Sequence, residues 1–148
     1  MRKLILVAVI IVSVFLIGCS VSTDLAVINL SDRPVEIKYR FKEFPGGFYP
    51  QKPATKAHAE IDRDYAWREL PVEQYLVDSE SRTITVTLAP KTALLVGRFN
   101  GLGIPTADQF ALSEIVMRGA YGTVILHGEQ LRKSFAEEVT QVSSIKYK

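Results

Sequence analysis

Apolar and charged side chains alternate over residues 35–41, and this is the clearest sign of secondary structure in the chain. Four apolar residues alternate there with three charged ones, in the order Val-Glu-Ile-Lys-Tyr-Arg-Phe. Successive side chains of a strand point to opposite faces, so the pattern predicts a strand with one face on a core and one in water. Residues 25–30 form a mostly apolar, β-prone run, and residues 29–34 supply Asn, Asp and Pro for a turn. We therefore expect an antiparallel hairpin of residues 25–30 and 35–41.

Further strands are expected downstream from alternating or short apolar runs. They are residues 56–61, 72–77, 82–88, 92–96, 112–118 and 123–127, with a closing strand at Ile145 and Tyr147. The turns and loops between them, rich in Gly, Pro, Asp or Ser, are residues 78–81, 89–91, 99–108 and 119–122. Short strands joined by turns in this way are typical of an antiparallel sheet protein.

Only two segments have a helical pattern. Residues 62–70 are expected to form one or two turns of helix before Pro71. Apolar side chains recur at helical spacing over residues 131–142, where Lys133 and Glu137 stand four apart. A short helix and a strand are equally compatible with that second segment.

The strand pattern as a whole indicates the fold class. Short strands at spacings near ten residues, without alternating helices, favour an antiparallel sandwich or barrel. We predict a mainly all-β fold, an antiparallel β-sandwich with one or two short helices. The order of strands resembles immunoglobulin-like envelope modules, although the Cys, Trp, Cys spacing of antibody-type domains is absent. Such a similarity of architecture carries no function.

The first twenty residues carry a targeting signal. Arg2 and Lys3 precede an apolar run over residues 4–17, and a small residue, Gly18, comes next. A charged start, an apolar stretch of this length and a small residue before the cut are typical of a signal peptide. The sequence Leu-Ile-Gly-Cys at residues 16–19 resembles the lipobox of bacterial lipoproteins. The resemblance implies cleavage before Cys19 and acylation of that cysteine by a diacylglycerol.

A retained transmembrane anchor is the main alternative to this interpretation, and plain signal cleavage is another. Residues 4–17 would span about 21 Å as a helix, whereas a bilayer core of about 30 Å needs about 20 residues. Polar residues 22–24 follow closely, so the apolar run cannot be extended. We therefore expect a signal peptide at residues 1–18, a short tether at 19–24 and a single β-sandwich domain at 25–148.

Removal of the leader changes the charge of the protein. Arg2 and Lys3 leave with it, so the 18 basic residues fall to 16, which balance the 16 acidic ones. A neutral domain lacks the basic field that nucleic-acid binding requires. Cys19 is the only cysteine, so no disulfide can form within the chain and packing must supply the stability.

Candidate chemistry is sparse. His58 and His127 stand in no recognisable hydrolase or metalloenzyme motif, and both are expected on the surface. Glu60, Asp62 and Asp64 form a local acidic cluster, but Arg63 interrupts it and no glycine supplies a calcium-loop turn. We expect no enzyme activity, no metal site and no cofactor.

Aromatic residues offer the candidate binding sites. Residues 44–50 hold three aromatic rings among prolines and glycines, with Phe48 and Tyr49 adjacent. These rings either form a platform for a partner or a glycan, or fold back over the end of the sandwich. Trp67, the only tryptophan, either plugs the edge of the core or lines a ligand site.

Together these features predict a cell-envelope lipoprotein that acts as a non-catalytic binding or assembly module. The alternative is a small-ligand or glycan-binding lipoprotein, with a hydrolase less favoured. The expected partners are the membrane, through the lipid on Cys19, and another envelope protein. Ser20 resembles the sorting signal for the outer membrane of enteric-type bacteria, which would place the domain in the periplasm; the rule fails for a Gram-positive source.

Overall fold

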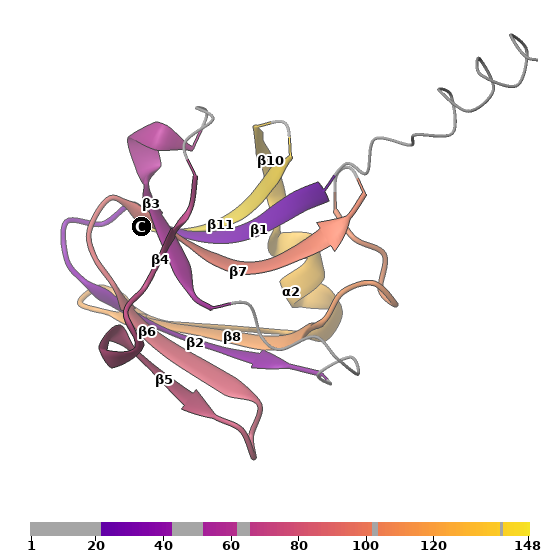
Figure 1. The fold of residues 1–148 in the computed structure, drawn as a ribbon, viewed down its shortest axis with the longest axis horizontal. Helices are drawn as coiled ribbons and strands as arrows, with labels where there is room; N and C mark the ends of the chain where they lie inside the picture. Colours follow the sequence, from indigo (N-terminus) through magenta and orange to yellow (C-terminus); the bar gives the residue numbers. More distant parts are fainter. Residues whose placement is uncertain (1–21, 43–51, 62–65, 102–103, 140) are drawn as a thin grey trace, which may run out of the picture.

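Two β-sheets lie face to face in the computed structural model, which describes residues 22–42, 52–61, 66–101, 104–139 and 141–148 (Figure 1). This arrangement confirms the predicted all-β sandwich. Strand β1 (Ser22–Asn29) lies inside the first sheet, and strand β2 (Val35–Phe41) lies inside the second. The sheet begins at Ser22, so residues 22–24 belong to it and not to the expected tether.

The first sheet has six strands, with β1 between β11 and β7. The order is β10 (Ala136–Val139), β11 (Val142–Tyr147), β1, β7 (Thr92–Asn100), β3 (Ala54–Ala57) and β4 (Arg68–Glu69). Strand β1 runs antiparallel to β7 and parallel to β11, so the first and last strands of the described chain lie side by side, with Ser22 and the C-terminus at opposite ends of the pair.

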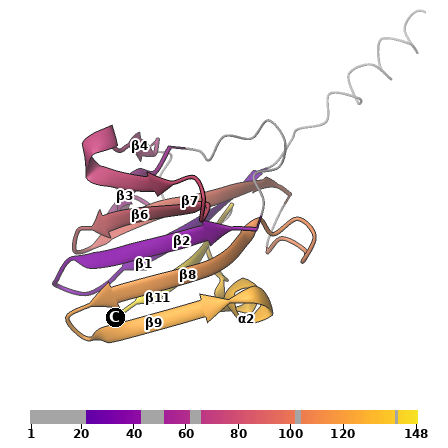
Figure 2. The same cartoon turned by 90° about the horizontal axis from the view of Figure 1, so that it is seen from below.

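The second sheet has five strands, all antiparallel to their neighbours. The order is β5 (Tyr75–Asp78), β6 (Thr83–Leu88), β2, β8 (Leu112–Gly119) and β9 (Gly122–His127). Three short helices complete the described fold: the 3-10 turns η1 (His58–Glu60) and η2 (Val72–Gln74), and α2 (Gly128–Ser134). Helix α2 follows β9 at one end of the sandwich (Figure 2).

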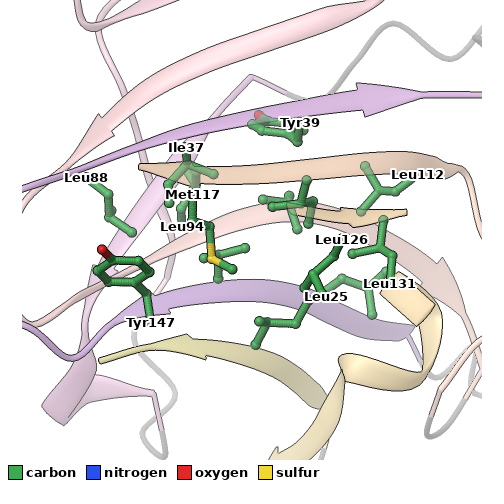
Figure 3. Packing of buried hydrophobic residues seen from close by; sticks show 14 of the residues in the cluster. Leu25, Ile37, Tyr39, Leu88, Leu94, Leu112, Met117, Leu126, Leu131 and Tyr147 are labelled. Atoms are coloured by element: carbon green, nitrogen blue, oxygen red, sulfur yellow. The ribbon is translucent and has the colours of Figure 1, made fainter. Parts of the chain in front are cut away.

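The main core fills the space between the two sheets (Figure 3). The alternation of β2 works as predicted, because Val35, Ile37 and Tyr39 are almost fully buried while the charged residues between them are not. Leu131 of α2 is also fully buried and closes the core at its end. Packing of this interface is the main source of stability that the sandwich architecture offers.

Strand β1 is buried on both faces, which explains its unbroken apolar run. Leu25 and Val27 point into the main core, whereas Ala26 and Ile28 lie on the outer face of the six-stranded sheet. That outer face carries a second cluster, which we call the outer cluster. Its members are Ala26, Ile28, Ile61, Ala93 and Val142, with Leu30 and Trp67 packed against it.

The predicted hairpin of residues 25–30 and 35–41 is wrong, because the two strands belong to different sheets. The turn between them is correctly placed, but it carries the chain from one sheet to the other. The buried Asn29 holds this crossing: its amide donates to the carbonyl oxygens of Arg33 (2.8 Å), Leu88 (3.2 Å) and Ala89 (3.1 Å). An apolar run shows that a strand is buried, not which strand it pairs with.

Several boundaries also differ from the predictions. Residues 56–61 are not one strand, since β3 ends at Ala57 and the 3-10 turn η1 follows. Residues 72–74 likewise form the 3-10 turn η2, and only Tyr75–Asp78 is extended. Strand β7 does not end near Gly97 but continues to Asn100. A β-bulge opposite Leu25 and Ala26 accommodates one extra residue of β7 at this place.

The two predicted helical segments have different outcomes. The helix expected at 62–70 is wrong at its end, where Arg68–Glu69 form β4, and residues 62–65 lie outside the described part of the chain. The segment 131–142 contains both alternatives in succession. Helix α2 starts earlier, at Gly128, and β10 and β11 follow it.

The predicted hairpin of residues 112–118 and 123–127 is confirmed as β8 and β9. Its turn depends on Gly119, because a Cβ there would lie 2.8 Å from Tyr147 Oη and 3.0 Å from Val35 Cγ2. The Tyr147 hydroxyl in turn donates to the Gly122 carbonyl oxygen at 2.9 Å. The last strand therefore packs directly under this turn.

Candidate functional site

Trp67 is the one aromatic site candidate that the structure describes, and its indole N–H already donates a hydrogen bond within the protein. The half-buried indole donates its N–H to Asp24 Oδ2 at 2.6 Å. The Lys56 ammonium lies 5.2 Å from the ring centroid, in a cation–π arrangement. The ring itself packs against the outer cluster, as the core-edge alternative expects.

Asp24 joins this tryptophan to strand β7. Arg98 donates from Nε to Asp24 Oδ1 at 2.5 Å and from Nη2 to Oδ2 at 3.2 Å, which makes a two-pronged ion pair. The hydrogen bond to Asp24 raises the pKa of the Arg98 guanidinium above its usual value. Both carboxylate oxygens are therefore engaged. This arrangement fastens the segment around Trp67 to the sheet and leaves Asp24 little capacity for a ligand.

The two histidines do not come together. His58 opens the η1 turn beside the six-stranded sheet, and its backbone N–H donates to the Lys91 carbonyl oxygen at 2.9 Å. His127 ends β9 on the five-stranded sheet, exposed, with Nδ1 3.6 Å from Glu114 Oε2. His58 does not belong to the strand expected at residues 56–61, because β3 ends at Ala57.

The other predicted site residues lie outside the described residues. They are Cys19, Phe48 and Tyr49, as well as Asp62 and Asp64 of the acidic cluster. Among the residues that the structure does describe, no group of three or more His, Cys, Asp or Glu is placed to hold a metal ion. None of the described helices is long and apolar enough to cross a membrane.

Apart from Ile104, the large apolar side chains that are exposed in the described part of the chain lie at the two edges of the five-stranded sheet. At the β5 edge these are Val72, Leu76 and Val77, with exposed fractions of 69%, 75% and 49%. At the β9 edge they are Tyr121, Val124 and Ile125. Exposed apolar side chains on a sheet edge are typical of a surface that another molecule covers.

Leu76 and Ile125 occupy equivalent places on the outer face of this sheet. The register aligns Leu76 with Thr85, then Lys38, Val116 and finally Ile125 at the far edge. Residues directly opposite one another share a face. The row therefore has an apolar residue at each end and Lys38 in its middle. Val77 belongs to the neighbouring row, which points toward the core.

The edges differ in charge. Residues 70–81, which include β5, contain three acidic residues and no Lys or Arg. Glu69 before them belongs to β4 of the other sheet and forms an ion pair with Lys52. Residues 119–126, which lead into β9, contain no charged residue at all. The Ser81 hydroxyl and nearby backbone N–H groups bind the Asp78 carboxylate, and they lower its pKa below the usual value. Asp78 therefore stays ionised at neutral pH.

Sequence reasoning missed the β5 edge, although a signal was present. Residues 70–81 contain Glu73, Asp78 and Glu80 and no Lys or Arg. The pattern of residues 72–77 predicts a strand that pairs with the next one, but it does not indicate that the other edge of this strand is unpaired among the described strands. Comparisons with protein-family models, with curated proteins and with solved structures found no match.

Proposed function

We propose that this chain is a bacterial cell-envelope lipoprotein whose β-sandwich is a non-catalytic binding or assembly module. The lipobox-like residues 16–19 support the anchor. Strand β1 begins at Ser22, so only residues 20 and 21 separate it from Cys19. A tether of that length reaches about 10 Å. It would hold the domain close to the periplasmic surface of the outer membrane.

The observation that carries the binding role is the exposed apolar surface at both edges of the five-stranded sheet. Such edges are a liability for a free protein, because they invite pairing with other chains. A module that binds another envelope protein turns this liability into a contact surface. The ligand-binding alternative receives less support, since Asp24 and Lys56 already engage Trp67.

The anchor is tested in the native host by intact mass. We expect acylated Cys19 at the mature N-terminus, and we expect Cys19→Ala to abolish both acylation and cleavage. An unmodified mature Cys19 would contradict the proposal.

The binding role is tested by photo-crosslinking in the intact envelope. A photoreactive amino acid is placed at position 76, at position 125, or at the exposed Thr87 on β6 as a control. We expect a discrete crosslinked product from at least one sheet edge and none from position 87. Absence of a product from both edges would contradict a binding module that uses them.

A further inference from the structure

Strand β5 has a free side that is suited to pairing. It forms a ladder with β6 on one side, and no other described strand pairs with it. The other sheet protects its edges better: β4 consists of Arg68 and Glu69 alone, and β10 carries two glutamates in its sequence. Charged and very short edge strands are the usual protection against unwanted pairing. Strand β5 has no proline, and its only charged residue, Asp78, stands at its end.

The side chains of this edge offer anchors on both faces. Leu76 projects on the outer face, while Val77 lies on the face toward the core and remains half exposed. A strand added alongside β5 would place its alternate side chains against both. Main-chain hydrogen bonds supply affinity in such strand addition, and the alternate side chains supply specificity.

Charge decides between a second copy and a different partner. Pairing of β5 with itself would bring together the acidic residues of both copies, which are Asp78 in the strand and Glu73 and Glu80 beside it. Repulsion between like charges opposes such a pair. The acidic residues of 70–81 instead complement a basic segment.

We infer that the free edge of β5 binds an extended segment of another envelope protein in which apolar residues alternate with Lys or Arg. This inference rests on the proposed function and names the contact surface and the kind of partner. The added strand extends the five-stranded sheet by one. Its basic side chains lie on the outer face, beside Asp78, and its apolar side chains lie on the face toward the core, against Val77.

The test uses the purified full-length mature chain in detergent and two short labelled peptides, one alternating Lys with Val and the other alternating Glu with Val. We expect the basic peptide to bind, to slow hydrogen exchange of β5 amides, and to bind more weakly as salt rises. The acidic peptide is expected not to bind. Equal binding of both peptides would refute the charge argument.

Two matched variants locate the site, because Leu76 and Ile125 are the two ends of one row on the same face. Leu76→Lys places a cation next to Asp78 on the outer face, so repulsion should weaken basic-peptide binding about tenfold or more. Ile125→Lys should leave it unchanged. A loss confined to Ile125→Lys, or no loss in either variant, would overturn the assignment to β5.

Three further outcomes are distinguishable. If the full chain self-associates and Leu76→Lys makes it monomeric, the occupant is a second copy and the inference fails. If envelope crosslinks form at position 125 and not at 76, the binding function stands while the β5 assignment fails. Absence of crosslinks at both positions would refute the function itself, whatever the peptides do.

Discussion

The burial of the outer cluster leads to a prediction: replacing one of its residues should destabilise the fold, although the cluster lies on an outer face of the sandwich. On the outer face of a two-layer sandwich, side chains are generally polar and their replacement is cheap. Ile28 lies on that face and yet is fully buried, among Ile61, Ala93 and Val142. We therefore expect Ile28→Ala to behave as a core substitution.

The magnitude follows from the atoms removed. The substitution deletes three carbon atoms, worth about 0.8 kcal/mol each in transfer free energy. A cavity term adds to this, and buried Ile→Ala changes cost about 2 to 5 kcal/mol in total. We expect a loss near 3 kcal/mol, which would lower the melting temperature by about 10 °C in a domain of this size.

Urea denaturation of the chain from Ser20 onward measures this loss. Ile37→Ala serves as the matched control in the main core, since Ile37 is also fully buried. Leu76→Ala is the exposed control and should stay within about 0.5 kcal/mol. If Ile28→Ala lowers the free energy of unfolding no more than Leu76→Ala does, while Ile37→Ala lowers it by several kcal/mol, then Ile28 is not buried on the outer face and the reasoning is refuted.

Three other predictions concern the fastening of the six-stranded sheet and the buried tyrosine of the five-stranded sheet. Trp67→Phe keeps an aromatic ring, although a smaller one, and removes the indole N–H donor to Asp24, so it should cost about 1.5 to 3 kcal/mol in urea denaturation, and less in an Asp24→Ala background. A chain that starts at Leu25 lacks the first residues of β1 and should melt below one that starts at Ser22, whereas equal melting temperatures would show that these residues add nothing. Burial raises the pKa of Tyr39 well above its usual value of 10.0. The free energy of unfolding is therefore unaffected by this group below pH 10 and falls as the pH rises further, because the unfolded state loses the proton first. Tyr39→Phe should lessen that fall in urea denaturation series at pH 9 to 11.

The sequence predicted best where one face of a strand meets water. In β2 the charged residues mark the solvent side, so both the strand and its inward residues could be identified. In β1 both faces are covered, and an apolar run then contains no information on its neighbours. The crossing from β1 to the other sheet is held by Asn29, whose side-chain amide donates hydrogen bonds to residues about 60 positions away.

The candidate site was predictable only in part. Trp67 could be recognised as a core-edge residue from its type, but its partners Asp24 and Arg98 come from strands far apart in the sequence. The strand at Lys56 could not be placed from the sequence, because a charged residue is expected in water. The Lys56 side chain is buried instead, with its ammonium over the Trp67 ring. The free edge of β5 is a property of sheet order, which no local pattern encodes.

The position of β1 has a mechanical consequence for an anchored protein. Its first residue is the point where a pull on a lipid at Cys19 would enter the fold. Neighbouring strands hold it on both sides, β7 along its whole length and β11 from Asp24 to Asn29. Tension along the strand loads both ladders in shear, so that many hydrogen bonds resist together. An edge strand such as β5 would instead be peeled off one bond at a time.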